Sequence, residues 1–572
     1  MAYVLADNIV SPLGTSSAEN YRAVKDGKSG LRTYTPGSNG VPEAFAASLL
    51  SDAQKAQLEV EAQETLFEAM VEVSARRALA DVPAGVLDGR TILIISSTKG
   101  AVDEGVGLAA SAERIAEKLG LKTKPIVVCN ACISGLSALV LACRLLDAHC
   151  YDYAVVCGAD TPGRFITSGF QSLKALAAEP CRPFDMERFG LNLGEAAATM
   201  VLAARQPDKP ETARGVWQLS RGCIRNDAYH ISAPSKTAEG LYLALSETMR
   251  GTEPSELAML NAHGTATLFN DQMESVAIQR AGLSEVPADA LKGYFGHTLG
   301  AAGILETIIC MKAVADGVVP ATHGFEELGV SGKVSISADN RQTKGDTFVK
   351  MLSGFGGCNA TIMAKKTGVA GAMSAEDNAK QESPVLKITH RVTVCREGVT
   401  VDGVSLDLKA GDSGAQLLVE AYRQKIGGYP KFYKMDALSR LGFVASELLL
   451  QAEGKARFEE CDNRAVVLFN HTSSVCSDKK YEESISGADS YYPSPTVFVY
   501  TLPNIVTGEI AIRNHYHGET SFYILPCKDE ALIHEVLCTA FADRRTASVL
   551  SGWIDYDADG TFEADLFLAE RQ

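Results

Sequence analysis

The sequence lacks the features of a membrane protein, a secreted protein or a broad nucleic-acid-binding protein. Its 572 residues contain no apolar run long enough to cross a bilayer. Residues 1–7 have neither a basic segment nor a long apolar core, so we expect no secretory signal. Acidic residues outnumber basic ones, 70 against 54, and the net charge of −16 argues against general nucleic-acid binding.

The 14 cysteines follow neither a zinc-site nor a disulfide pattern. Cys129 and Cys132 form one Cys-x-x-Cys pair, but no second pair follows at zinc-site spacing. Most of the others lie in apolar segments, which is typical of buried, reduced thiols. The chain also lacks a dinucleotide-binding fingerprint. We therefore expect a cytoplasmic protein without a metal or a redox cofactor.

Length and composition predict at least two domains. Residues 367–384 are small and polar and are interpreted as a linker between a first domain, 1–366, and a second, 385–572. In the first domain short apolar strands alternate with helices, which predicts an α/β fold with a mostly parallel sheet covered on both faces. The expected strands are 91–96, 125–129, 153–157, 198–203 and 258–261, and the expected helices are 63–80, 109–119, 135–148 and 238–249.

The second domain resembles an internal repeat of the front half of the first domain, although an unrelated α/β domain is the alternative. Residues 465–474 echo 91–100, and Cys527 falls on Cys132 when the flanking segments are aligned without gaps. Three charged residues, 528–530, replace the glycine-containing helix start that follows Cys132. Charges of this kind disfavour a thiolate, so we predict that the second domain is not catalytic.

One cysteine and two histidines indicate the chemistry of the first domain. Cys132 lies where a strand-like apolar run meets a small, glycine-containing helix start, so backbone N–H groups and the helix dipole favour its thiolate. His263 and His297 each lie beside glycines at the end of a strand, where a ligand can approach the backbone closely. Taken singly, each residue is best explained as part of the core. Together they predict a thioester enzyme.

These residues belong to an ordered set of motifs that resembles the β-ketoacyl-acyl-carrier-protein synthases, the elongating condensing enzymes of the thiolase-like superfamily. The resemblance covers essentially residues 1–366 and implies a thiolase-like fold, layered αβαβα, for the first domain. The second domain resembles a truncated half of such a fold, similar to synthase-like proteins of aryl-polyene and flexirubin pathways. The matching motifs are residues 9–14, 130–135, 182–185, 261–267, 296–303 and 354–360.

The resemblance implies a role for each matched residue. Cys132 would accept the acyl chain, and His263 and His297 would stabilise the enolate that forms when a malonyl group decarboxylates. Lys292 and Glu306 would be supporting charges. The other implied roles are an oxyanion hole from the backbone N–H groups of Cys132 and Phe355, a gate at Phe355, phosphopantetheine binding by Thr265 and Thr267, an acyl pocket at Ile133, Phe170 and Leu502, and a carrier-protein contact at Lys174.

The implied reaction is a decarboxylative Claisen condensation of malonyl-carrier protein with the acyl chain on Cys132. It would serve fatty-acid or polyketide biosynthesis, with the aryl-polyene type as one candidate. The substrates would arrive on the phosphopantetheine of an acyl carrier protein, with no other cofactor and no nucleic-acid or membrane partner. The second domain would be a dimer partner or a chain-length-factor-like half, with a strand near 521–525 pairing with the one near 125–129. An ordinary homodimer is the alternative arrangement.

Two other functions stay open at this point. A thiolase acting on coenzyme A esters would use a second cysteine as base, and Cys358 lies in the C-terminal glycine loop. Its spacing matches instead the small residue of the condensing-enzyme loop, and His297 is present as the second histidine. A non-catalytic chain-length subunit would lack part of the catalytic set, whereas Cys132, His263 and His297 are all present.

Overall fold

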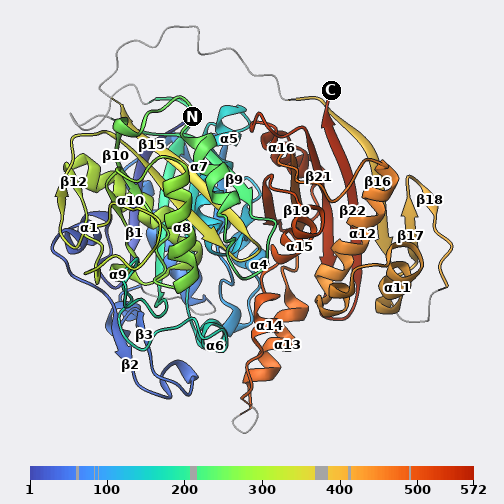
Figure 1. The fold of residues 1–572 in the computed structure, drawn as a ribbon, viewed down its shortest axis with the longest axis horizontal. Coiled ribbons are helices and arrows are strands. Elements are labelled where there is room, and N and C mark those ends of the chain that lie inside the picture. Colours follow the sequence, from blue (N-terminus) through green and yellow to red (C-terminus); the bar gives the residue numbers. More distant parts are fainter. Residues whose placement is uncertain are drawn as a thin grey trace.

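The computed structural model describes residues 1–58, 64–82, 84–87, 89–206, 216–367, 384–409, 414–487 and 491–572. The predicted linker, 367–384, lies almost entirely outside these ranges. The chain forms two parts that lie side by side: a larger first half up to residue 367 and a smaller second half from residue 384 (Figure 1). In the described part of the chain, no helix has both the length and the apolar character to cross a membrane.

The first sheet of the first half is mixed. Strand β4 pairs in parallel with β5 and β6, whereas β8 is antiparallel to both β1 and β6. The expectation of a mostly parallel sheet is therefore wrong here. Strand β8 is buried along its whole length, so its continuous apolar sequence is the same as that expected of a parallel strand. The strand order is β1 (Ala2–Val10), β8 (Ala196–Ala203), β6 (Tyr153–Asp160), β4 (Thr91–Ser96) and β5 (Ile126–Val128).

A second mixed sheet completes the first half. Strand β10 is parallel to β11 and β14, and β15 is antiparallel to β14 and β9. The strand order is β11 (Ala288–Asp289), β10 (Leu257–Asn261), β14 (Thr347–Gly354), β15 (Cys358–Thr367) and β9 (Val216–Asn226).

Helices form the other three layers. Helices α5 (Ser134–Asp147) and α10 (Ala302–Ala315) lie between the two sheets and contact both. Helix α3 (Leu66–Ala80), with α4 (Leu108–Lys118), covers the outside of the first sheet. Helix α7 (Glu239–Thr248), with α8 (Leu268–Arg280), covers the outside of the second sheet. The predicted αβαβα layering is confirmed.

The starts of the two central helices touch at glycines. A Cβ atom on Gly303 would lie 2.2 Å from the backbone nitrogen of Leu136, and one on Gly135 would lie 2.7 Å from the carbonyl oxygen of Gly300. Real Cβ atoms do not approach backbone so closely, so both positions require glycine. This contact brings the chain before α5, which contains Cys132, next to the chain before α10, which contains His297.

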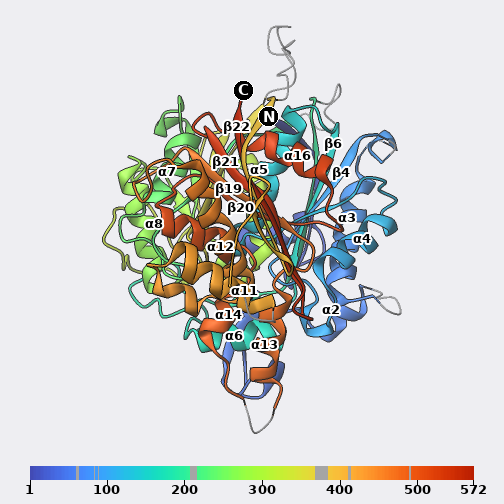
Figure 2. The ribbon, with the colours of Figure 1, turned by 90° about the vertical axis from the view of Figure 1, so that its right-hand side faces the viewer.

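The second half repeats part of this design. Strand β19 lies between β20 and β21 and is parallel to both, as β4 is to β5 and β6. Helices α12 (Ala437–Glu453) and α16 (Glu530–Ala540) cover opposite faces of this sheet (Figure 2), and α15 (Ile505–Asn514) packs beside α12. The strand order is β20 (Thr520–Ile524), β19 (Arg464–Asn470), β21 (Ser548–Tyr556), β22 (Phe562–Arg571) and β16 (Leu386–Cys395).

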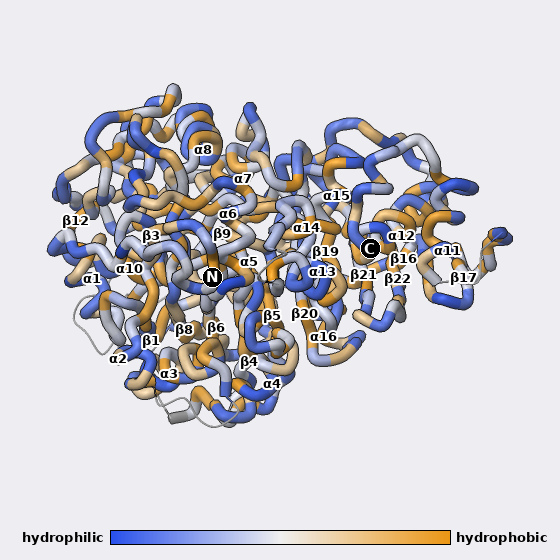
Figure 3. Tube along the Cα trace, turned by 90° about the horizontal axis from the view of Figure 1, so that it is seen from below, coloured by the Kyte–Doolittle hydropathy of each residue, from blue (hydrophilic) through white to orange (hydrophobic). Residues whose placement is uncertain are grey.

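The two halves share one continuous sheet. Strands β5 and β20 pair antiparallel, with Val128 opposite Tyr523 and Val127 opposite Ile524. The N–H of Cys129 donates to the carbonyl of Phe522 at 3.1 Å. The two strands meet at the junction of the halves in Figure 3. The predicted pairing of these segments within one chain is confirmed.

Buried ion pairs reinforce this junction. In each of three pairs the first half supplies the cation and the second half the carboxylate: Lys99 with Asp478, Arg144 with Glu519, and Arg225 with Asp543. A buried charge that loses its partner is strongly destabilising, so these pairs favour this mutual position of the halves.

Candidate active site

Cys132 lies in a single 3-10 turn, Ala131–Ile133, that joins β5 to α5. Ala131 has a positive φ of 47°, so the chain turns sharply just before the sulfur. The backbone N–H groups of Cys132 and Phe355 lie near the Cys132 sulfur and act to lower the pKa of its thiol. These are the two groups predicted to form the oxyanion hole.

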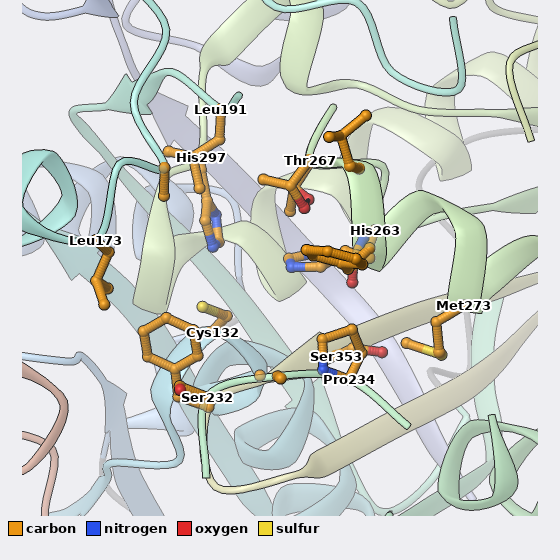
Figure 4. A pocket seen from close by; sticks show the side chains of 18 of the residues that line it. Cys132, Leu173, Leu191, Ser232, Pro234, His263, Thr267, Met273, His297 and Ser353 are labelled. Carbon is orange, nitrogen blue, oxygen red and sulfur yellow. Dashed lines mark hydrogen bonds between the residues drawn. The ribbon is translucent and has the colours of Figure 1, made fainter. Parts of the chain in front are cut away.

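The structure brings the three predicted catalytic side chains together. The sulfur of Cys132 and one ring nitrogen from each of His263 and His297 all lie within 4.8 Å of one another. The two imidazoles are nearly perpendicular, at 81°, with their centres 5.0 Å apart. Figure 4 shows the sulfur and both rings facing a common space. One thioester bound there can contact all three groups.

Both histidines are neutral in this environment. Burial, and then the charge of Lys292, lower the pKa of His263 and His297 well below its ordinary value. The N–H of Leu299 donates to Nδ1 of His297 at 3.3 Å, so the proton of the neutral ring lies on Nε2. In the described chain, Nε2 of His297 and Nδ1 of His263 are buried without a hydrogen-bond partner. Buried polar atoms without a partner are rare in folded proteins.

The expectation of a resting thiolate at Cys132 is not met. Burial raises the pKa of its thiol to about 12, although Lys292 and the two backbone N–H groups oppose this rise. The helix start that follows the cysteine is itself buried, so loss of hydration outweighs its favourable dipole. At neutral pH the Cys132 side chain is therefore a thiol.

This state predicts how Cys132 responds to pH. Alkylation of Cys132 by iodoacetamide is expected to become roughly tenfold faster per pH unit from pH 7 to pH 10 without a plateau, because only the thiolate reacts. Mass spectrometry of the peptide that contains Cys132 measures it separately from the exposed Cys527. A rate that levels off below pH 8 would contradict a raised pKa.

Lys292, Glu306 and Lys350 form a buried network of ion pairs near the two histidines. Nζ of Lys292 lies 2.9 Å from Glu306, and Lys350 binds the other oxygen of the same carboxylate. All three side chains are at least 98% buried. Two ammonium groups share one carboxylate in this network, and the charges of both lysines contribute to the lowered pKa of both histidines. Lys350 was not predicted, although a lysine in the otherwise apolar strand 347–354 was the available signal.

Two buried carboxylates position the histidine loops, and neither was predicted. Glu274 accepts hydrogen bonds from the N–H groups of His263 at 2.6 Å and Gly264 at 2.8 Å. Asp160 accepts one from the N–H of Gly300 at 2.7 Å, three residues after His297. Burial raises the pKa of Glu274 to about 7. Tertiary packing brings each carboxylate to its histidine loop, so no local sequence motif indicates its role.

The largest cavity that contains these groups is about 390 Å³ in volume and reaches Cys132, His263 and His297. Thr265 and Thr267, predicted to bind phosphopantetheine, line its wall with their hydroxyl oxygens 2.9 Å apart. Three further predicted residues also line it: Phe170, Lys174 and Phe355. Lys174 is exposed to solvent.

A second cavity, of about 20 Å³, lies against Cys132 on the side of the second half. Leu502, Phe498 and Thr501 come from the second half and close this cavity, facing Phe170 from the first half. Leu502 and Cys132 therefore line the same cavity, and the role of Leu502 in an acyl pocket stays a prediction. Ile133 does not line either of these cavities; its fully buried side chain packs into the core around α5, so its assignment to the acyl pocket is not supported.

The glycine loop that contains Phe355 belongs to the first half, but the second half packs against it. The side-chain amide of Asn504 donates to the carbonyl of Phe355 at 2.9 Å. A Cβ atom on Gly508 would lie 2.6 Å from the carbonyl oxygen of Gly356, so α15 rests directly on the loop. Asn504 and Gly508 were not assigned to the site from the sequence. The loop that carries one predicted oxyanion donor thus contacts the second half directly.

Cys358 lies close to Cys132 but does not line the larger cavity. Its thiol donates to the carbonyl oxygens of Phe355 at 3.2 Å and Asn130 at 3.7 Å. Burial raises its pKa well above the ordinary value. These contacts are those of a structural thiol that fixes two loops.

Two family models match the first half: the "Beta-ketoacyl synthase, N-terminal domain" over residues 96–207 and the "Beta-ketoacyl synthase, C-terminal domain" over residues 219–326. Nodulation protein E of Rhizobium meliloti (strain 1021) is 30% identical over 287 residues, which cover 48% of this chain and 71% of that protein. The 3-oxoacyl-[acyl-carrier-protein] synthase 2 of Coxiella burnetii is 27% identical over 399 residues, 63% of this chain and 96% of that protein.

Solved structures share the fold. The PfaC keto synthase–chain length factor matches with a TM-score of 0.74 and 14% identity, covering 100% of this chain and 78% of that one. A ketosynthase in complex with its chain length factor from Xenorhabdus doucetiae matches with a TM-score of 0.56 and 21% identity, covering 64% and 98%. The motifs, the layered fold and these relatives agree: the chain belongs to the β-ketoacyl synthase family, the condensing enzymes of fatty-acid and polyketide biosynthesis.

Proposed function

We propose that this chain catalyses the decarboxylative condensation of malonyl-carrier protein with an acyl chain held on Cys132. The observation that carries the proposal is the meeting of one sulfur, two neutral imidazoles and two backbone N–H donors at the base of one cavity. Both substrates would be thioesters on the phosphopantetheine of an acyl carrier protein, and no further cofactor takes part. We place the reaction in the cytoplasm, where thiols stay reduced.

The first step is acyl transfer. The Cys132 sulfur attacks the carbonyl carbon of the acyl-carrier thioester, and the N–H groups of Cys132 and Phe355 stabilise the negative charge on its oxygen. The carbon–sulfur bond to the carrier breaks, and the thiol proton passes to the departing carrier sulfur. The acyl chain then extends toward the small cavity lined by Phe170 and Leu502.

The second step joins the two units. The malonyl thioester oxygen lies between His263 and His297, and loss of carbon dioxide leaves an enolate there. The free Nε2–H of His297 donates to this oxygen, and the net positive charge of the lysine–glutamate network lowers the energy of the anion. The enolate carbon attacks the acyl carbonyl on Cys132, the Cys132 thioester breaks, and one proton is taken up to restore the thiol.

Intact-mass measurement tests this scheme directly. Incubation with acyl-carrier protein is expected to add one acyl group to the chain, and later addition of malonyl-carrier protein is expected to remove it with release of a β-ketoacyl product. A chain that acquires no acyl group from any carrier protein, at any acyl length, would contradict the proposal.

A thiolase acting on coenzyme A esters is the second candidate, because Cys358 lies near Cys132. Its thiol is engaged by two carbonyl groups and does not line the larger cavity, which favours a structural role. Comparing acylation of Cys132 by acyl-carrier protein and by acyl-coenzyme A separates the two functions. The three side chains also match zinc ligands in type, but their positions within the two matched β-ketoacyl synthase domains favour acyl chemistry.

We also propose that the second half sets the length of the product and is not itself catalytic. Leu502 and Phe498 close the small cavity, and Cys527 is exposed at the surface. Leu502→Ala is therefore expected to shift the main product to longer chains while the rate with short chains falls less than about tenfold, because the added space admits further carbons. Chromatography of the products reports the shift.

Val497→Ala is the matched control, because Val497 is a partly buried neighbour of Phe498 that does not line the cavity. It is expected to leave the product unchanged. If Leu502→Ala gives the wild-type product distribution while remaining active, the second half does not set chain length through this wall.

A further inference from the structure

Five large apolar side chains are exposed together around the opening of the main cavity. Three of them, Phe189, Leu268 and Phe269, line the opening itself. Met186 lies on the same loop as Phe189, and Leu328 bridges to Asp185 in that loop. We call this set the apolar platform: Met186 is 56% exposed, Phe189 75%, Leu268 50%, Phe269 74% and Leu328 36%.

The backbone beneath the platform is fixed by one buried arginine. The guanidinium group of Arg188 is almost fully buried and donates to the carbonyl oxygens of Asp185 at 2.8 Å and Gly329 at 2.6 Å, and to that of Leu268 at 3.3 Å. Three separate segments, each carrying exposed platform residues, are thus tied to a single side chain. The N–H of Met186 also donates to the carbonyl of Glu327 at 2.9 Å.

This rigidity sets the platform apart from scattered surface residues. Clustered apolar side chains on a soluble surface mark interaction sites, and aromatic residues and methionine are enriched where proteins meet. A pre-ordered backbone loses little entropy when a partner docks. The platform surrounds the opening that leads to Cys132, so whatever delivers a thioester through this opening must lie against it.

The charges at the rim do not form a basic patch. Glu187 and Glu326 are largely exposed, and Arg182 lies 3.5 Å from each of them. Arg182 is also 3.9 Å from Asp185, so its charge is shared among three carboxylates. The exposed Lys174 also lines the opening. Among the described residues that line this cavity, it is the only lysine or arginine. Long-range attraction of an acidic partner by this surface is therefore weak.

We propose that the acyl carrier protein docks on the apolar platform through an apolar face, instead of being held mainly by basic residues. This inference rests on the proposed condensation and specifies how its macromolecular substrate is recognised. It assigns Lys174 a minor share of the binding, in contrast to the carrier-protein role implied for it by the sequence.

The test compares a substrate that can reach the platform with one that cannot. The double variant Met186→Ser, Leu328→Ser changes two platform residues that do not line the cavity. With a single-domain malonyl-carrier protein, its KM is expected to rise about tenfold with kcat nearly unchanged, as for loss of central apolar contacts. With malonyl-pantetheine, which has no protein part, KM and kcat are expected to stay within twofold of the wild type.

Two controls accompany the double variant. Val404→Ser removes another exposed apolar side chain, in the second half, and it is expected to leave all kinetic constants unchanged. Lys174→Ala is expected to raise the carrier-protein KM less than threefold. Raising the salt concentration from 50 to 500 mM is expected to change the wild-type KM less than threefold, because few ionic contacts are lost.

The outcomes separate the two proposals. If the wild type condenses neither substrate, the proposed function fails, and calorimetric binding of the carrier protein to the wild type and the double variant still tests the platform. An unchanged carrier-protein affinity in the double variant overturns the docking proposal, as does a large loss caused by salt or by Lys174→Ala. A platform that instead pairs two copies of this chain would show itself as a wild-type dimer that the double variant converts to a monomer.

Discussion

Replacing Cys132 by alanine is expected to lower condensation by at least about 10³-fold, because the acyl chain then has no sulfur to which it can be transferred. The wild type should show one acyl adduct by intact mass, and Cys132→Ala should show none. The imidazoles and the lysine–glutamate network are unchanged in this variant. The KM for malonyl-carrier protein is therefore expected to change little.

The control for this experiment is Cys527→Ala. Cys527 is the pseudo-equivalent cysteine of the second half and is exposed, with its sulfur 3.6 Å from Nζ of Lys124. This variant is expected to keep both the adduct and the full rate. If Cys132→Ala instead condensed substrate at more than a tenth of the wild-type rate, the covalent route would be excluded.

Glu306→Gln is expected to be the most destabilising single change at the site. It leaves the ammonium groups of Lys292 and Lys350 buried without a carboxylate, a loss that typically costs about 3–5 kcal/mol. The whole stability of a domain is commonly about 5–15 kcal/mol, so much of it would be lost. Urea unfolding at pH 7 measures the change.

A surface ion pair provides the comparison. Lys333 and Glu285 form a pair in which both side chains are mostly exposed, and Glu285→Gln is expected to change stability by less than about 1 kcal/mol. The double variant Glu306→Gln, Lys350→Met removes one of the two charges left unpaired and is expected to recover part of the loss. Equal effects of Glu306→Gln and Glu285→Gln would contradict a structural role for the buried network.

Much of the first half could be predicted because its elements have strong local signals. The predicted strand 91–96 coincides with β4, and the predicted helix 135–148 differs from α5 by one residue at each end. Strand direction had no such signal, because a fully buried antiparallel strand such as β8 has the same continuous apolar sequence as a parallel one. Sequence patterns therefore located the strands but not their direction.

The site, too, contains residues that could be predicted from the sequence and residues that could not. Cys132, His263 and His297 could be predicted because each lies in a compact glycine-containing motif of consecutive residues. Asn504 and Lys350 act through contacts between distant segments, so their roles appear only when the chain is folded. The protonation state of Cys132 was misjudged for the same reason, because a local helix start is visible in the sequence whereas the extent of burial around it is not.

The pairing of β5 with β20 has a consequence for how the enzyme behaves in dilute solution. Both halves belong to one polypeptide, so their association is unimolecular, and the specific activity should not fall at enzyme concentrations where two separate subunits would come apart. Cys132 has imidazoles within reach, whereas Cys527 lies at the surface. Each molecule is therefore expected to load a single acyl group. With one active site per molecule, its saturation curve is expected to be hyperbolic.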